Sequence, residues 1–160
     1  MMQQKRKMLL NAYIEQLQDL APSSAATALD LYVFHSDIEV ASSRLYRDGH
    51  YKQAALEANL RVLDEVKRAS GISDEGDSLI DRAFGIDRKI PVIQFNSLET
   101  EAQREEQRGT MYLFKGIAGL CNSKAHSDHP FDDPLVAHEY LALASLLMRM
   151  LEIAQINKER

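Results

Sequence analysis

The sequence predicts an all-α protein, and three observations support this prediction. Almost every periodic segment has the spacing of a helix, and no stretch alternates apolar and polar residues over more than a few positions. The two most apolar segments, residues 111–120 and 141–151, are too apolar to be surface helices. The chain has 160 residues, of which 45% are hydrophobic, so a single helical domain can bury a core without disulfides.

An N-terminal helix is expected first, and it is set apart from the rest of the chain. Its apolar stripe consists of Leu10, Ile14, Leu17 and Leu20. Pro22-Ser23-Ser24 ends or interrupts this helix, and residues 21–34 fit either a short helix or a tether. We therefore predict an N-terminal helical arm over residues 1–33 and a helical bundle over residues 34–157.

Three helices are expected at the start of the bundle. Ser36 is a candidate N-cap, with Glu39 at the spacing of a capping box, and the helix that it opens should stop at Gly49. The second helix follows His50 and ends at Gly71. A shorter helix is expected from Asp77 to Phe84.

An extended connection should follow around Pro91. Val92, Ile93 and Phe95 fit a short strand-like crossing. Since one strand makes no sheet, no sheet is predicted.

A long helix is predicted from a capping box at Thr100 and Gln103 to about Asn122. Its interior contains three glycines, each costing about 1 kcal/mol relative to alanine. These are Gly109, Gly116 and Gly119. Close packing of the helix backbone against a neighbour is the predicted reason for them.

The final helix should begin with Asp133 as N-cap and Pro134 in the first turn. From Leu141 to Leu151 it is apolar almost all round. Such a helix is either central in a bundle or half of a dimer interface.

Charge and composition exclude several classes of protein. A net charge of −5 argues against a broad electrostatic attraction to nucleic acid, although a small local basic site is compatible with it. One cysteine builds neither a zinc finger nor a disulfide framework. No signal peptide is recognisable, and the richest apolar window is shorter than the roughly 18 residues of a membrane span. We expect a cytoplasmic protein that does not enter a membrane.

The polar stretch 122–129, between the two most apolar segments, holds the best candidates for chemistry. His126 can take and give a proton near neutral pH, as phosphodiester transesterification requires, or it can simply cap a helix end. Lys124 can hold a phosphate or interact with terminal carbonyls. Cys121 is a minor candidate for a nucleophile, against a small apolar residue at a buried helix end.

Further cations lie on the long helix. Arg108 and Lys115 fall in one narrow sector with Asn122, as does Arg104, and together they could lead a phosphate to the polar stretch. The alternative is a surface laced with salt bridges, because glutamates 101, 105 and 106 are neighbours. His126, Asp128 and His129 match no metal motif with an enforced geometry. We therefore predict neither a metal nor a cofactor.

A resemblance to a known family covers about residues 34 to 152. It is carried by Arg47-Asp48-Gly49-His50-Tyr51, Ala54, Glu57-Ala58, Ser70-Gly71, Leu79, Ala83-Phe84, Glu106-Gln107, Gly109, residues 114–119, Asn122 through Ala125-His126, Asp133-Pro134, Ala137 and Glu139 through Leu147. Together these residues resemble the Ymh-type family of prokaryotic and phage proteins, placed within the HEPN superfamily of helical bundles.

The resemblance implies an up-and-down helical bundle that commonly forms homodimers. In many members of the superfamily it also implies metal-independent RNA cleavage, in phage defence or toxin–antitoxin systems. Those enzymes use an arginine, a polar residue directly after it, and a histidine after a short spacer. Asn122 and His126 match the second and third elements, whereas Cys121 stands where the arginine would fall. Cysteine offers no forked, permanent cation to hold the scissile phosphate.

Three hypotheses are compatible with these observations. The first is an endoribonuclease that uses His126, with Asn122 and Lys124 holding the phosphate and Lys115 or Arg108 as further cations. The second is a catalytically degenerate subunit that binds RNA or a protein partner, such as an antitoxin or a component of a defence complex. The third is a homodimeric scaffold. Because Asn122 and His126 keep the spacing of the family's enzymes, the sequence slightly favours the endoribonuclease hypothesis.

Overall fold

The computed structural model describes residues 34–87, 90–123 and 132–157, all within the unit Phe34–Arg160. The helices that it describes are α3 (Ser36–Arg47), α4 (Tyr51–Ser70), α5 (Gly76–Phe84), α6 (Glu101–Ser123) and α7 (Pro134–Ile153). The prediction of an all-α bundle is therefore confirmed. The predicted arm over residues 1–33 lies outside the described residues.

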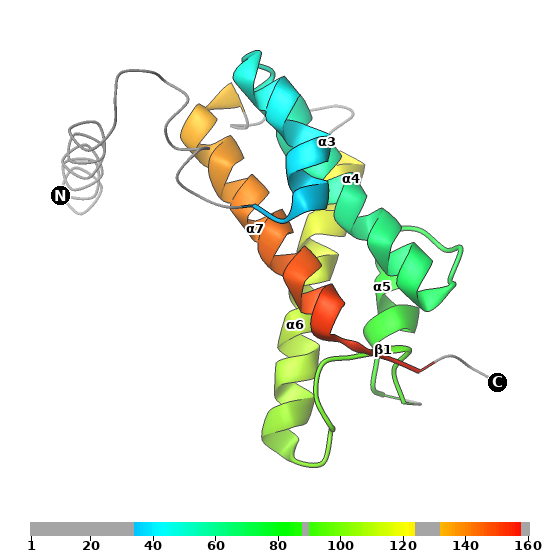
Figure 1. Cartoon of the computed structure of the whole chain (residues 1–160). Coiled ribbons are helices and arrows are strands. Elements are labelled where there is room, and N and C mark those ends of the chain that lie inside the picture. Colours follow the sequence, from blue (N-terminus) through cyan, green and yellow to red (C-terminus); the bar gives the residue numbers. More distant parts are fainter. Residues whose placement is uncertain (1–33, 88–89, 124–131, 158–160) are drawn as a thin grey trace, which may run out of the picture. The chain divides into compact units, whose positions relative to one another are not determined.

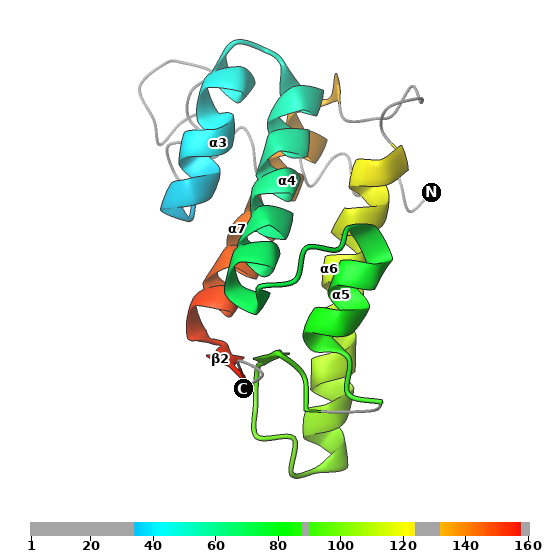
Figure 2. The same cartoon turned by 90° about the vertical axis from the view of Figure 1, so that its right-hand side faces the viewer.

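Helix α4 lies at the centre of the bundle, and α3, α5, α6 and α7 all pack against it (Figure 1). Helices α3 and α6 run in one direction, and α4 and α7 in the other. Helix α5 lies along α6 (Figure 2). The buried side of α4 consists mostly of small and β-branched residues, which let the neighbouring helices approach it: Ala54, Ala55, Ala58, Val62 and Val66.

Most helix ends form where the capping residues predict them. Thr100 and Gln103 form the reciprocal capping box, with Gln103 N–H donating to Thr100 Oγ1 at 3.2 Å and Thr100 N–H donating to Gln103 Oε1 at 3.1 Å. Asp133 Oδ1 accepts the N–H groups of the first turn of α7, and Pro134 is its first residue. Gly71 ends α4 at a φ of 73°, where glycine is favoured.

The predicted N-cap of α3 is wrong by one residue. His35, and not Ser36, is the cap, because its Nδ1 accepts the N–H of Asp37 at 3.2 Å. Ser36 is the first residue of the helix. The imidazole is held in this position by Glu152 of α7, whose Oε1 lies 2.9 Å from His35 Nε2.

The bundle also contains a small two-stranded sheet, whereas the sequence predicted no sheet. Strand β1 (Ile93–Gln94) pairs antiparallel with β2 (Gln155–Ile156), with Ile93 opposite Ile156. The chain after α7 thus returns to the connection before α6. The side chain of Asn157 strengthens the pairing by donating to Pro91 O at 2.9 Å and to Gln94 Oε1 at 2.8 Å.

Stacked aromatic rings join α5 to α6. The ring of Phe84 lies 4.6 Å from that of Phe114 and 5.5 Å from that of Phe95, between centroids. Beside them Gln107 is fully buried, and its amide donates to Phe84 O and Ile93 O while accepting the N–H of Phe95. One side chain thus fixes α6 against both α5 and β1.

Candidate functional site

The predicted site lies where α6 ends, and the structure describes part of it. Asn122 is in the last turn of α6, as predicted, and Cys121 precedes it with intermediate exposure. His126 and Lys124 lie outside the described residues, so their approach to Asn122 stays a prediction.

Cys121 continues the buried side of α6. It follows Phe114 by seven residues and Ile117 by four, and both of those side chains are buried. A small, weakly polar side chain suits such a position, whereas an arginine would have to bring its charge out to solvent. The choice between a packing residue and a nucleophile at Cys121 stays a prediction.

Both predicted phosphate-binding cations on α6 are held by carboxylates. Lys115 Nζ lies 2.6 Å from Asp81 Oδ1 on α5, and this hydrogen bond raises the pKa of Lys115. Arg108 pairs with Glu105 one turn earlier and with Glu101 at 3.4 Å. The two cations lie along one side of α6, as predicted. Both form salt bridges with carboxylates, so this surface fits the alternative interpretation of an ordinary salt-bridged helix surface.

No group of three or more histidine, cysteine or acidic side chains that could hold a metal ion occurs among the described residues. The incomplete cluster around His126, Asp128 and His129 falls largely outside them. None of the helices in the described ranges is long and apolar enough to cross a membrane.

No other described helix of the subunit packs closely on the glycines of α6. A Cβ atom added at Gly109, Gly116 or Gly119 would meet no atom of the described residues within 4 Å outside its own helix turns. All three are exposed, on the side of α6 opposite to Phe114 and Ile117. The close backbone packing that the sequence predicts is therefore not found among the described residues of one subunit.

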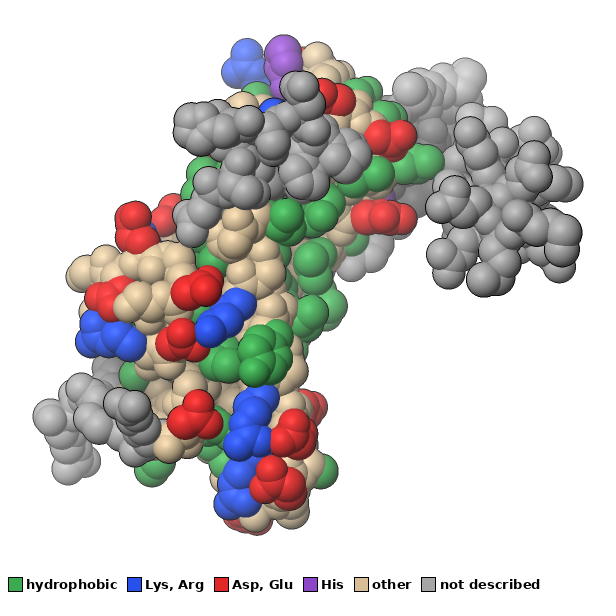
Figure 3. All heavy atoms as spheres, turned by 180° about the vertical axis from the view of Figure 1, so that it is seen from behind, with side chains coloured by type: hydrophobic (Ala, Val, Ile, Leu, Met, Phe, Trp, Pro, Cys, Tyr) green, Lys and Arg blue, Asp and Glu red, His purple; other side chains and the backbone are tan. Residues whose placement is uncertain are grey.

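An uncharged face of α6 surrounds these glycines, and sequence reasoning missed it. At 100° per residue, Tyr112, Leu113 and Leu120 fall within the same half of the helix as the three glycines. Tyr112 is 62% exposed and Leu113 45%. Figure 3 shows this side of the molecule, with hydrophobic side chains gathered along its middle above paired arginines and glutamates. We call Gly109, Tyr112, Leu113, Gly116, Gly119 and Leu120 the α6 face.

Near the start of α7, His138 lies among aromatic rings. Its ring centroid is 5.2 Å from that of Phe34 and 6.2 Å from that of Tyr46, in edge-on arrangements. Desolvation by burial lowers the pKa of His138 below its ordinary value, and Glu139 opposes the shift more weakly. This histidine was not a sequence candidate, and its neutral ring serves the packing between α3 and α7.

One family matches the chain over residues 33–151, and it is described as "Protein of unknown function (Hypoth_ymh)". No curated protein and no solved structure matches the chain. The matched range begins just before α3 and ends in the last turn of α7.

Proposed function

The chain belongs to the Hypoth_Ymh family, and from this premise we propose that it is a non-catalytic, HEPN-like interaction subunit that pairs with a second copy of itself through the α6 face. We place it in the cytoplasm, in the phage-defence or toxin–antitoxin setting that the family resemblance implies. There the pair would present its outer surfaces to an antitoxin or another component of a defence complex.

The observation that carries the proposal is the position of the glycines. Each costs about 1 kcal/mol in the interior of a helix, and none is explained by a neighbour within the described part of the subunit. Glycines on one side of a helix let a second backbone approach closely. A helix from another molecule is therefore the simplest explanation for Gly109 and Gly116, which lie two turns apart on the same side.

The large exposed residues of the α6 face also favour a second copy of the chain as the partner that covers it. Exposed tyrosine and leucine beside glycines give an apolar surface with ridges and a groove, which suits another helix better than water or RNA. Because the α6 face carries no charge of its own, two copies can meet without burying an unpaired ion. A two-fold axis would place each copy's Leu113 against the groove of the other.

The charges on the flank of α6 argue against RNA as the principal ligand. Phosphate binding needs cations that are not already neutralised, and Lys115 and Arg108 are both paired with carboxylates. Cys121 supplies no charge in place of the family's arginine. The contacts available on α6 are thus those of protein association.

Oligomeric state tests this proposal directly. We expect the wild-type protein to sediment as a dimer at micromolar concentration and Leu113→Glu to sediment as a monomer with an unchanged helical circular dichroism spectrum. Val40→Glu is the matched control, because Val40 is 86% exposed on α3 and lies outside the α6 face. A monomeric wild type, or a Leu113→Glu variant that still dimerises, would rule the proposal out.

A second candidate function is the metal-independent endoribonuclease, which the position of Asn122 favours. Asn122 lies in the last turn of α6, and the sequence reaches His126 four residues later. This hypothesis requires RNA cleavage in excess chelator that is lost in His126→Ala. If the parent is inert and Cys121→Arg cleaves RNA, the site is a decayed nuclease site; if both are inert, only the binding role remains.

A further inference from the structure

The outer side of α7 carries apolar residues that stay exposed in the described part of the subunit. The inner side of the helix is buried against α4 and α3. On the opposite side, Leu146 is 48% exposed and Ile153 is 83% exposed. At 100° per residue, six outward residues fall within about a quarter of the helix circumference. We call these residues the α7 face: Leu135, Glu139, Ala142, Leu146, Arg149 and Ile153.

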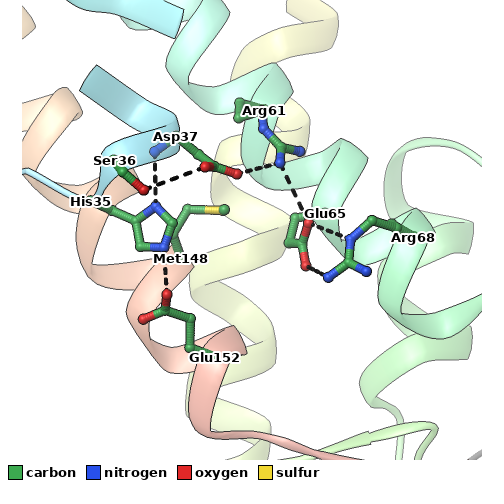
Figure 4. A pocket seen from close by; sticks show the side chains of 8 residues that line it. All are labelled: His35, Ser36, Asp37, Arg61, Glu65, Arg68, Met148 and Glu152. Carbon is green, nitrogen blue, oxygen red and sulfur yellow. Dashed lines mark hydrogen bonds and ion pairs between the residues drawn. The ribbon is translucent and has the colours of Figure 1, made fainter. Parts of the chain in front are cut away.

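Two charged residues lie on the α7 face, and they have opposite signs. Glu139 is near the start of the helix and Arg149 is near its end, and both are exposed. Glu152 does not belong to the face, because its carboxylate turns toward His35 at the start of α3 (Figure 4). A partner that covers the α7 face therefore has to meet a carboxylate near one end, a guanidinium near the other, and apolar side chains between and beyond them.

The order of the residues along the α7 face is symmetric about its middle. They form three pairs, the members of each at equal distances on either side of Ala144: Leu135 with Ile153, Glu139 with Arg149, and Ala142 with Leu146. Two copies of α7 that run in opposite directions across a two-fold axis at this level bring the members of each pair together, one from each copy. A second copy of the same helix thus supplies what the face requires.

We propose that the α7 faces of two copies of the chain pair in this antiparallel way. Each copy's Glu139 then meets Arg149 of the other copy, and the larger Leu146 lies against the small Ala142. A parallel pairing would set Glu139 against Glu139 and Arg149 against Arg149, which like-charge repulsion disfavours. This pairing goes beyond the proposed function, because it joins pairs formed through the α6 face into a larger assembly.

The pairing does not require a free guanidinium at Arg149. This residue takes part in an interaction within its own chain, and a guanidinium has five N–H donors, so it can serve more than one acceptor. Exposed ion pairs contribute at most about 1 kcal/mol each. The charges therefore set the direction of the pairing, while the apolar residues that leave water supply most of its strength.

The pairing should be weaker than the one through the α6 face. It involves one helix of 20 residues from each copy, about 30 Å long. Helix α7 contains no glycine, so the two backbones stay farther apart than at the α6 face. An interface of this kind is at the small end of the known range, below about 1,200 Å² in total, and we expect a dissociation constant on the order of 100 µM.

Sedimentation equilibrium of the full chain between about 5 and about 500 µM tests the proposal. We expect the mass of the wild type to approach twice its low-concentration value, whichever species is present there, so this step is read separately from pairing through the α6 face. Leu146→Glu should keep its low-concentration mass throughout. Val40→Glu is the matched control and should behave like the wild type, because Val40 is exposed on α3 and lies outside the α7 face.

Charge reversal tests the direction of the pairing. Glu139→Arg alone brings like charges together at both contacts, and so does Arg149→Glu, so each variant should pair at least about tenfold more weakly than the wild type. An equimolar mixture of the two variants should recover pairing close to that of the wild type, because both contacts then join opposite charges again.

The proposal is overturned if the wild type gains no mass over this range, if Leu146→Glu gains mass as the wild type does, or if the mixture pairs no better than the separate variants. A wild type of constant mass together with a lower melting temperature in Leu146→Glu would show that another segment of the chain covers the α7 face, and this result would also overturn it.

Discussion

Lys115 on α6 is held by Asp81 on α5, with 2.6 Å between Nζ and Oδ1. The pair ties two helices together at the position where the sequence suggests a phosphate-binding lysine. Because the side chain of Asp81 is about half exposed, we expect a double-mutant cycle of Lys115→Gln and Asp81→Asn in urea unfolding to give a coupling of at most about 1 kcal/mol. RNA binding at low salt should be unchanged in Lys115→Gln, and a clear loss of binding would restore Lys115 as a phosphate contact.

Gln107 should be one of the most sensitive polar positions of the bundle. Replacing it with leucine leaves the N–H of Phe95 and two carbonyl oxygens without the partner they have here. We expect Gln107→Leu to lower the free energy of unfolding by about 2–4 kcal/mol. Gln53→Leu is the control, since Gln53 is exposed on α4 and should change stability little. Equal stability of the two variants would contradict the role given to Gln107.

Asn59 should be a position where the natural residue is not the most stable one. Its side chain is fully buried in α4, and neither amide atom has a hydrogen-bond partner among the described residues. We expect Asn59→Leu to raise the free energy of unfolding by about 1–2 kcal/mol, because a buried amide without partners costs desolvation energy. A loss of stability in denaturant unfolding would instead indicate that the amide has a buried partner, such as an internal water.

His138 should make the fold less stable in mild acid. Its pKa is lowered in the folded state by burial, so the unfolded chain binds a proton more readily than the folded one. The fold therefore has its full stability above the ordinary histidine pKa of about 6.5 and loses stability as the pH falls from there through the lowered pKa. Unfolding free energies measured at intervals between pH 7.5 and about pH 5 should fall less steeply in His138→Phe. An unchanged slope in this variant would contradict the assignment.

The helices could be predicted from the sequence because their ends depend on neighbouring residues. Thr100 with Gln103, Asp133 with Pro134, and Gly71 each act within one turn, so local spacing is sufficient. The exception is the start of α3. There the cap is an imidazole that Glu152 holds in place from 117 residues away, and no local pattern reveals such a partner.

The same distinction explains the sheet and the candidate site. The pairing of Ile93 with Ile156 joins segments far apart in the sequence, and Asp81 reaches Lys115 from another helix. The glycines of α6 were visible in the sequence, but whether they face a neighbour or solvent depends on which helices pack on each side. Their spacing with Tyr112 and Leu113 was the available signal for an uncharged outer face.

The most direct test of the α6 face is a sedimentation equilibrium measurement on Gly116→Leu. A Cβ atom added at this position would meet no atom of the described subunit within 4 Å, and leucine favours the helix over glycine by up to about 1 kcal/mol. We predict a melting temperature at high dilution that is equal to or above the wild-type value, together with a dimer dissociation constant at least about tenfold larger, because the side chain fills the groove that the second copy occupies. A dissociation constant equal to that of the wild type would contradict the account.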